Sequence, residues 1–208
     1  LPADNLLILN TLIERQLILG KNLFICFVDF SKAFDRVNRH FLFYKLIKSG
    51  FHGKVIDTMR NMYTKTFFRL KCNGKLSPRI LDELGVNQGG STSDIFFRRY
   101  MADLGDYLTE NIGICIEDMI LIHLLWADDL LLVSDTLSGM QKQLNGLARF
   151  CGDNHAIVND IKTKLMLVGS YSGETELMFN GKAITCVDKY KYVGNIIRSI
   201  KSLRGDIF

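Results

Sequence analysis

The spacing of apolar residues along the chain predicts a succession of helices and strands. From Leu6 to Leu19 apolar residues recur every three or four positions, which predicts an amphipathic helix that ends before Gly20. Residues 23–30 (LFICFVDF) form an almost uninterrupted apolar run, rich in aromatic and branched side chains, which is typical of a buried strand. The same reasoning predicts further helices over residues 39–48, 54–65, 94–108 and 138–151.

Two apolar runs on either side of a pair of aspartates give the clearest local prediction. Residues 119–126 and 130–134 are expected to be strands, and Asp128-Asp129 is expected to be the polar break between them. Residues 67–72 alternate like a half-buried strand and lead into Asn73-Gly74, which is a strong hairpin-turn signal. Further strands are expected over residues 157–159, 164–168, 177–179 and 190–197. We therefore predict an α+β fold in which helices pack against an antiparallel sheet.

Composition narrows the class of protein. The chain has 208 residues, of which 48% are hydrophobic and 23% charged, so it can form a sizeable core and is not a disordered segment. A formal net charge of +4 permits a polyanionic partner without requiring one. The five cysteines form no CxxC pair and are odd in number, which argues against a disulfide framework or a zinc site and favours a reducing compartment. The longest apolar stretch is too short to span a bilayer, and the chain, which starts without methionine, is expected to be part of a longer polypeptide.

Three aspartates stand where apolar strands are expected to end. Asp29 lies at the end of one run, and Asp128 and Asp129 separate two others. Ionised carboxylates beside a dry core are costly unless a cation or hydrogen bonds compensate them. Taken singly, Asp29 could cap the helix that follows, and the aspartate pair could be an ordinary turn. If the strands are neighbours, however, the three carboxylates converge on a site suited to Mg²⁺.

A site of this kind has a defined chemistry. Two divalent ions about 3.5–4 Å apart activate an attacking hydroxyl and stabilise a leaving phosphate oxygen, which indicates in-line phosphoryl transfer. The carboxylates alone are also compatible with a metal-dependent phosphatase or nuclease.

Five segments resemble, in the same order, motifs A to E of reverse transcriptases. FVDFSKAFDRV (27–37) resembles motif A, GVNQGG (85–90) is similar to the GxxQG core of motif B, and WADDLLLVS (126–134) resembles motif C. IVNDIKTKLMLVG (157–169) resembles motif D with its Asn-x-x-Lys, and YKYVGNII (190–197) resembles motif E, the primer grip. The AFD, ADD, KTK and YVG elements are closer to non-LTR (LINE-like) retrotransposon enzymes than to retroviral ones. A phosphatase or nuclease does not explain the Gln-Gly loop.

This resemblance implies a polymerase palm-type sheet packed on helices over residues 1–208, with part of the fingers at residues 40–85 and with most of the fingers and the thumb missing. It implies RNA-directed DNA polymerase activity as part of retrotransposition, with two Mg²⁺ ions, for which Mn²⁺ can substitute. The expected partners are an RNA template, a DNA primer and deoxynucleoside triphosphates, with no membrane. Further expected partners are the remaining fingers, the thumb and any endonuclease domain of the parent polypeptide. The resemblance also implies an intracellular protein, found in the nucleus and cytoplasm.

The resemblance also assigns catalytic roles to individual residues. Asp29 and Asp128 are expected to be the principal metal ligands, and Asp129 the supporting member of the pair. Lys162 is the candidate general acid for the leaving pyrophosphate, because a positioned ammonium can donate a proton as charge develops. Lys164 is a competing register for that role, and an isolated lysine is otherwise simply solvated.

Substrate contacts are implied at five further positions. Phe34, five residues after the motif A aspartate, is expected to pack under the sugar and leave no room for a 2′-OH. Gln88 and Gly89 are expected near the template base and the incoming nucleotide, and Tyr192 and Gly194 at the primer end. Without the motifs, Phe34 is a core phenylalanine, the glycines belong to a surface loop, and Tyr192 lies in an ordinary strand.

Several positions depart from the family pattern. The family usually continues from motif B into a segment with proline, whereas this chain reads GSTSD, and Asn87 stands at a position that is often basic. Trp126 replaces a smaller aromatic residue, and His155-Ala156 stands where Gly-Leu is common. None of these departures replaces an aspartate that is expected to bind metal, but several of the positions are expected to contact substrate. The alternatives are therefore a catalytically inactive remnant that binds nucleic acid or acts structurally, and, less favoured, a polymerase of the group II intron or telomerase type.

Overall fold

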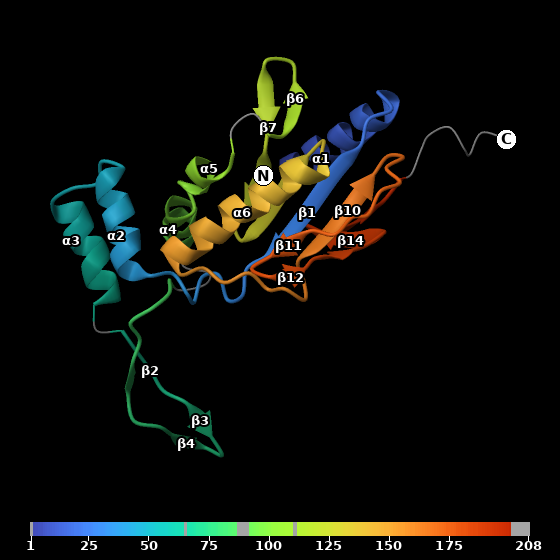
Figure 1. The fold of residues 1–208 in the computed structure, drawn as a ribbon. Coiled ribbons are helices and arrows are strands. Elements are labelled where there is room, and N and C mark those ends of the chain that lie inside the picture. Colours follow the sequence, from blue (N-terminus) through green and yellow to red (C-terminus); the bar gives the residue numbers. More distant parts are fainter. Residues whose placement is uncertain (1, 65, 87–91, 110–111, 201–208) are drawn as a thin grey trace. The chain divides into compact units, whose positions relative to one another are not determined.

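The computed structural model describes residues 2–64, 66–86, 92–109 and 112–200 (Figure 1). The chain forms two compact units. The first unit contains residues 1–31, 104–153 and 157–208, and the second contains residues 32–103 and 154–156.

A five-stranded sheet is the framework of the first unit. Its strand order is β13-β10-β1-β9-β8, so the two strands that are expected to carry carboxylates are direct neighbours. These strands are β1 (Leu23–Asp29), β8 (His123–Trp126), β9 (Asp129–Ser134), β10 (Lys164–Val168) and β13 (Thr185–Cys186). All pairs are antiparallel except β10 with β13, so the sheet is mixed where an antiparallel one was expected.

The alternation of β1 side chains explains how the sheet is covered. Leu23, Ile25 and Phe27 project from one face and belong to a buried cluster with residues of α1 (Pro2–Ile18). That cluster also contains Leu131 of β9 and Met166 of β10, so three strands share one apolar face. In Figure 1, α6 (Leu137–Asn154) lies across the sheet, and its side chains at 140, 144, 147 and 150 are fully buried. Both faces of the sheet are buried at β1, which explains why the sequence of this strand is an almost uninterrupted apolar run.

Smaller elements complete the first unit. They are helix α5 (Leu104–Tyr107), the hairpin of β6 (Ile114–Ile116) with β7 (Met119–Leu121), the pair of β11 (Met178–Phe179) with β12 (Lys182–Ala183), and the hairpin of β14 (Lys189–Tyr192) with β15 (Asn195–Arg198). The last hairpin is predicted from sequence as a single strand over 190–197. Its two-residue turn, Val193-Gly194, has positive φ at both residues, which bends the apolar run back on itself.

The second unit is helical and carries a long hairpin. Its helices are α2 (Arg39–Lys48), α3 (Lys54–Tyr63) and α4 (Ser93–Tyr100), and its hairpin consists of β2 (Phe67–Phe68), β3 (Lys71–Cys72), β4 (Lys75–Leu76) and β5 (Ile80–Leu81). Helix α2 is capped by Asn38, whose side-chain Oδ1 accepts hydrogen bonds from the backbone N–H groups of His40 and Phe41. The predicted helix over 94–108 is interrupted after Tyr100, and residues 104–107 form α5.

A buried arginine holds the base of the hairpin. Arg39 Nε donates to the carbonyl of Gly85 at 2.8 Å, and its Nη2 donates to the carbonyl of Leu84 at 2.7 Å and to Asp82 Oδ2 at 3.1 Å. Its guanidinium also lies over the ring of Tyr63, 5.1 Å from the centroid. Arg39 therefore connects the C-terminal end of α3, at Tyr63, to residues 82–85, which follow β5.

The α+β class predicted from sequence is confirmed. The assignment of residues 40–85 to the fingers stays a prediction. None of the helices in the described part of the chain is both long enough and apolar enough to cross a membrane.

Candidate active site

The register of the central strands brings two aspartates face to face. Asp29, the last residue of β1, is paired with Asp129, the first residue of β9. Side chains opposite each other in an antiparallel pair lie on the same face of the sheet, so the two carboxylates are neighbours. Asp128 precedes Asp129 in the turn that joins β8 to β9. The convergence expected if the strands were adjacent is therefore confirmed for Asp29 and Asp129.

The turn that presents these aspartates is short and contains a residue with positive φ. Trp126 pairs with Asp129, which leaves only Ala127 and Asp128 as the loop. Ala127 has φ +51°, a left-handed conformation that is unfavourable for a residue with a Cβ. Strained backbone of this kind persists where the surrounding structure holds it, here between two strands of the central sheet.

Electrostatic repulsion is concentrated at this end of the sheet. Burial raises the pKa of Asp129 above its ordinary value, and the charges of Asp128 and Asp29 raise it further. Like charges directly opposite each other on neighbouring strands are destabilising. A cation bound between these carboxylates would remove that repulsion, so the unbalanced negative charge itself favours a cation site.

The donor set suits a hard divalent ion. Carboxylate oxygens are the ligands that Mg²⁺ prefers, and Asp29, Asp128 and Asp129 supply only such oxygens. Among the residues that the structure describes, no three His, Cys, Asp or Glu side chains lie close enough together to hold a metal ion as they stand. The residues therefore fit the ion chemically, and side-chain adjustment is needed before three of them share it.

A lysine already lies beside the carboxylates. Lys162 Nζ is 3.6 Å from Asp29 Oδ1, and its side chain is 65% exposed. Lys164, the competing candidate, is instead the first residue of β10 and pairs with Phe27 in the sheet. Geometry therefore favours Lys162 over Lys164 as the cation next to the aspartates.

The loop before β10 is built to place this lysine. Asn159 Oδ1 accepts hydrogen bonds from the backbone N–H groups of Ile161 and Lys162, at 3.1 and 3.2 Å. The backbone N–H of Asn159 donates to the carbonyl of Asp29 at 2.7 Å, and the N–H of Asp29 donates to Thr163 Oγ1 at 3.3 Å. Both ends of the loop are thus tied to the backbone of Asp29, which explains the close approach of Lys162.

The β14–β15 hairpin reaches the same face of the sheet. The ring of Tyr190 stacks on Phe27, with centroids 4.2 Å apart and planes at 13°. Burial raises the pKa of Tyr190, and the charges of Asp29 and Asp129 raise it further. Tyr192 is only 3% exposed and belongs to the same buried cluster as Phe27, whereas Gly194 lies in the turn with φ +81°. The roles of Tyr192 and Gly194 at a primer end stay predictions.

Phe34 lies in the second unit, where its ring stacks on Phe97 of α4 with centroids 4.5 Å apart. The backbone around it holds the start of the glycine-rich segment: Val86 N–H donates to the carbonyl of Phe34, and Gly85 N–H donates to that of Val37. Motif A and motif B are thereby joined at the backbone. Gln88 and Gly89 lie outside the described residues, and their contacts, like that of Phe34, stay predictions.

Comparison with known families decides the class of the chain. A family profile described as "Reverse transcriptase (RNA-dependent DNA polymerase)" matches residues 6–197. The chain belongs to the reverse transcriptase family. This match covers all five segments on which the resemblance was based.

Related proteins place this reverse transcriptase among retrotransposon enzymes. It is 29% identical over 143 residues to the Pol polyprotein of the type-2 retrotransposable element R2DM of Drosophila melanogaster, covering 69% of the chain and 14% of that protein. It is 26% identical over 212 residues to the Pol polyprotein of the type-1 element R2 of Nasonia vitripennis, covering 95% and 20%. The chain thus spans a fifth or less of the length of these curated relatives. The expected likeness to non-LTR enzymes is confirmed.

Solved structures confirm the reverse transcriptase fold. Telomerase of Candida tropicalis in complex with a fragment of telomeric RNA is similar with a TM-score of 0.60 at 15% identity, covering 91% of the chain and 33% of the telomerase. A telomerase of the same species, truncated from its C-terminal domain, is similar with a TM-score of 0.55 at 17% identity, covering 91% and 40%. At these identities the likeness shows the fold alone.

Three residues at the candidate site were not predicted as site residues from the sequence. Asn159 and Thr163 position the lysine loop, and Tyr190 lies beside the carboxylates. Asn159 was visible only as the first letter of Asn-x-x-Lys, and Tyr190 only as part of motif E. Thr163 gives no signal of its own, because its hydrogen bond joins residues 134 positions apart.

Proposed function

We propose that this chain is the catalytic core of an RNA-directed DNA polymerase of a retrotransposon. It would add deoxynucleotides to a primer 3′-OH on an RNA template and release pyrophosphate. The observation that carries the proposal is the register that sets Asp29 opposite Asp129, with Lys162 3.6 Å from Asp29. A phosphatase or nuclease also needs carboxylates, but the family match over residues 6–197 favours the polymerase.

The aspartates would serve as ligands. Two divalent ions, when bound, supply activation of the primer hydroxyl and stabilisation of the leaving phosphate oxygen. Asp29 and Asp128 would hold the ions, and Asp129, opposite Asp29, would add negative charge that favours their binding. The 3′-hydroxyl would lose its proton to solvent, and its oxygen would form the new bond to the α-phosphorus as the bond from that phosphorus to pyrophosphate breaks.

Lys162 would deliver a proton to that leaving group. Asn159 Oδ1 fixes the backbone N–H of Lys162, and the ammonium lies 3.6 Å from Asp29 Oδ1 while the side chain stays accessible to solvent. A positioned general acid of this kind contributes about 10²–10⁴-fold to the reaction rate. Phe34 would exclude ribonucleotides, Gln88 and Gly89 would contact the template base and incoming nucleotide, and Tyr192 and Gly194 would support the primer end.

Primer extension on an RNA template tests this proposal. The parent polypeptide is assayed with Mg²⁺ or Mn²⁺, alongside Asp128→Asn and a matched control, Asp118→Asn, in the exposed β6–β7 turn. We expect extension by the parent protein and the control but not by Asp128→Asn. Extension that survives in Asp128→Asn would refute the metal role of Asp128.

Absence of extension from a folded parent protein would instead favour the inactive remnant. The altered sequence after motif B, GSTSD without proline, is the observation that favours this second candidate.

A further inference from the structure

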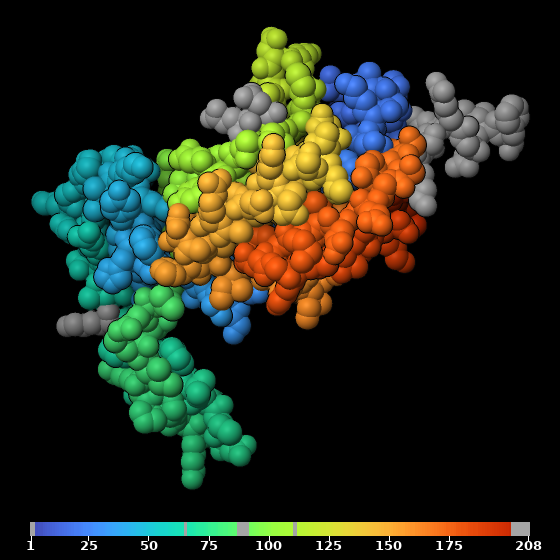
Figure 2. All heavy atoms as spheres, viewed as in Figure 1, coloured from blue at the N-terminus to red at the C-terminus, as the bar shows by residue number. Residues whose placement is uncertain are grey.

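A hairpin of the second unit projects as a narrow arm from the helices of that unit. It covers residues 67–81 and turns at Asn73-Gly74, where both residues have positive φ. Phe67 pairs with Leu81 near the base, and Lys71 pairs with Leu76 near the end. Figure 2 shows the arm in green, standing away from α2 and α3.

Almost nothing in its own unit covers the arm. Every residue from 67 to 81 except Ser77 is exposed. Six large apolar side chains among them are between 37% and 61% exposed: Phe67, Phe68, Leu70, Leu76, Ile80 and Leu81. Successive strand residues project to opposite faces, so Phe67 and Phe68 expose one ring on each face of the arm. An isolated two-stranded hairpin is only marginally stable, and exposed apolar surface of this extent marks an interaction site.

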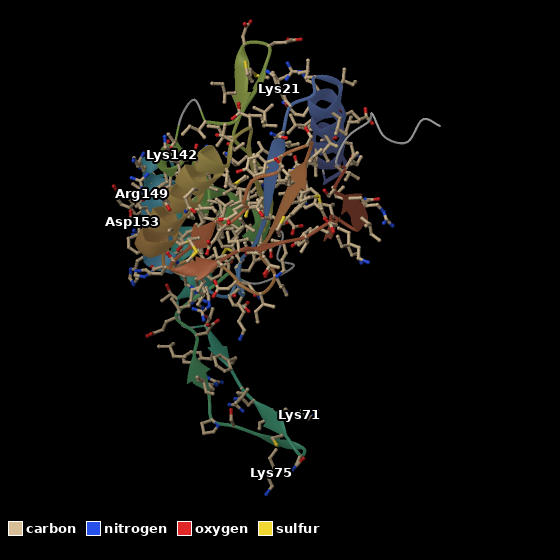
Figure 3. All side chains as sticks on the ribbon, turned by 45° about the vertical axis from the view of Figure 1, so that its right-hand side comes forward. Lys21, Lys71, Lys75, Lys142, Arg149 and Asp153 are labelled. Atoms are coloured by element: carbon tan, nitrogen blue, oxygen red, sulfur yellow. The ribbon has the colours of Figure 1, made fainter. Side chains whose placement is uncertain are left out.

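The charge of the arm is of one sign. Residues 66–81 contain four basic side chains and no acidic one: Arg69, Lys71, Lys75 and Arg79. None of these four forms an ion pair with a carboxylate in the part of the chain that the structure describes. Figure 3 shows Lys71 and Lys75 at the far end of the arm, pointing away from it.

We propose that this arm binds single-stranded nucleic acid, with its basic side chains on the phosphates and Phe67 and Phe68 stacked on bases. Exposed aromatic rings among cations without acids are the combination that single-strand binders use. The centres of protein–protein interfaces are depleted in lysine, which argues against a protein as the occupant. The inference rests on the proposed function only in naming the strand as the RNA template.

Fluorescence anisotropy with a labelled 20-nucleotide single-stranded RNA tests how much the basic side chains of the arm contribute to RNA affinity. The full chain is compared with Lys71→Gln/Lys75→Gln and with a matched control, Lys21→Gln/Lys142→Gln, which removes the same charge from exposed positions of the first unit. We expect the arm variant to bind about tenfold more weakly, and the slope of log affinity against log salt to fall by about 1.4 for two lost phosphate contacts. The control should leave both quantities close to those of the unmodified chain.

A second variant tests base stacking. Phe67→Leu/Phe68→Leu keeps apolar surface but removes both rings, so we expect affinity for the RNA to fall about 5- to 150-fold per stacked base. Binding to an abasic strand of the same length should not change. An apolar docking patch for a protein would tolerate leucine, which separates the two partners.

Three results would overturn the inference. An equal loss of RNA affinity in the arm variant and in the control would mean that RNA binds through the overall positive charge of the chain and not through the arm. Equal loss on the abasic strand would mean that the rings do not stack. Unchanged RNA affinity with reduced self-association in sedimentation velocity would make the arm a protein-docking surface. Asp128→Asn should leave RNA binding intact, so failure of the arm and failure of the polymerase proposal are distinguishable.

Discussion

Substitution of Gly85 by alanine tests how motif B is fixed to motif A. Gly85 has φ +80°, and a Cβ added there would lie 2.7 Å from the backbone oxygen of Asp35. Backbone atoms cannot swing aside as the end of a long side chain can. The carbonyl of Gly85 also accepts a hydrogen bond from buried Arg39, so any shift weakens that bond as well.

The expected cost follows from two contributions. The left-handed backbone costs an alanine about 1 kcal/mol relative to glycine. Overpacking against fixed neighbours adds about 1–3 kcal/mol, for a total of about 2–4 kcal/mol. Gly74 is the matched control, because its φ is +78° and a Cβ there would meet nothing within 4 Å, so Gly74→Ala should cost only about 1 kcal/mol.

Urea unfolding followed by circular dichroism at 222 nm measures both variants. We expect Gly85→Ala to lose about 1–3 kcal/mol more of the free energy of unfolding than Gly74→Ala. Equal losses would refute the argument that motif B is pressed against the backbone of motif A.

Three further predictions concern the carboxylate site. Asn159→Ala removes the acceptor of two backbone N–H groups, so it should lower the free energy of unfolding by about 1 kcal/mol and also lower the primer-extension rate. Asn159→Asp keeps an acceptor at this position and should restore the rate. Unchanged primer extension in Asn159→Ala would contradict the positioning role of Asn159. Ala127→Gly should be neutral or stabilising by up to about 1 kcal/mol in urea unfolding, because it relieves the positive φ, and a clear loss would argue against strain there. Because the pKa of Asp129 is raised in the folded protein, its protonated carboxyl group is compatible with the fold and its charged form destabilises the fold. Stability is therefore greatest below the ordinary pKa of an aspartate and falls as the pH rises through the raised pKa of the folded state. Asp129→Asn should therefore raise the melting temperature in EDTA at pH 7 but not at pH 3, and an equal effect at both values would exclude charge repulsion as the cause.

The centre of the site could be predicted from sequence because it depends on local patterns. The apolar run of β1 ends at Asp29, and the break between β8 and β9 contains Asp128 and Asp129, so each carboxylate was visible at a strand end. Adjacency of β1 and β9 was not visible, since strand order depends on contacts between segments about 100 residues apart in the chain. The Asn-x-x-Lys spacing predicted Lys162, which the structure places beside Asp29.

Two errors in the predicted elements have distant or hidden causes. The helix expected over 94–108 stops because Lys45 Nζ donates to the carbonyl of Tyr100 at 2.6 Å and to Asp103 Oδ1 at 2.6 Å, contacts with a side chain more than 50 residues away. The carbonyl of Tyr100 would otherwise serve the next turn of the helix. The turn at Val193-Gly194 was hidden inside an apolar run, because a β-branched residue rarely adopts the φ of +46° found at Val193.

Binding of Mn²⁺ tests most directly whether the opposed aspartates form a metal site. Electron paramagnetic resonance measures free Mn²⁺ as the parent polypeptide, Asp29→Asn and Asp118→Asn are titrated in turn. We expect Asp29→Asn to bind Mn²⁺ at least about tenfold more weakly, because it removes one of the opposed carboxylates, and Asp118→Asn to bind it like the parent protein. Equal affinity of Asp29→Asn and the parent protein for Mn²⁺ would show that the paired aspartates of β1 and β9 do not form a cation site.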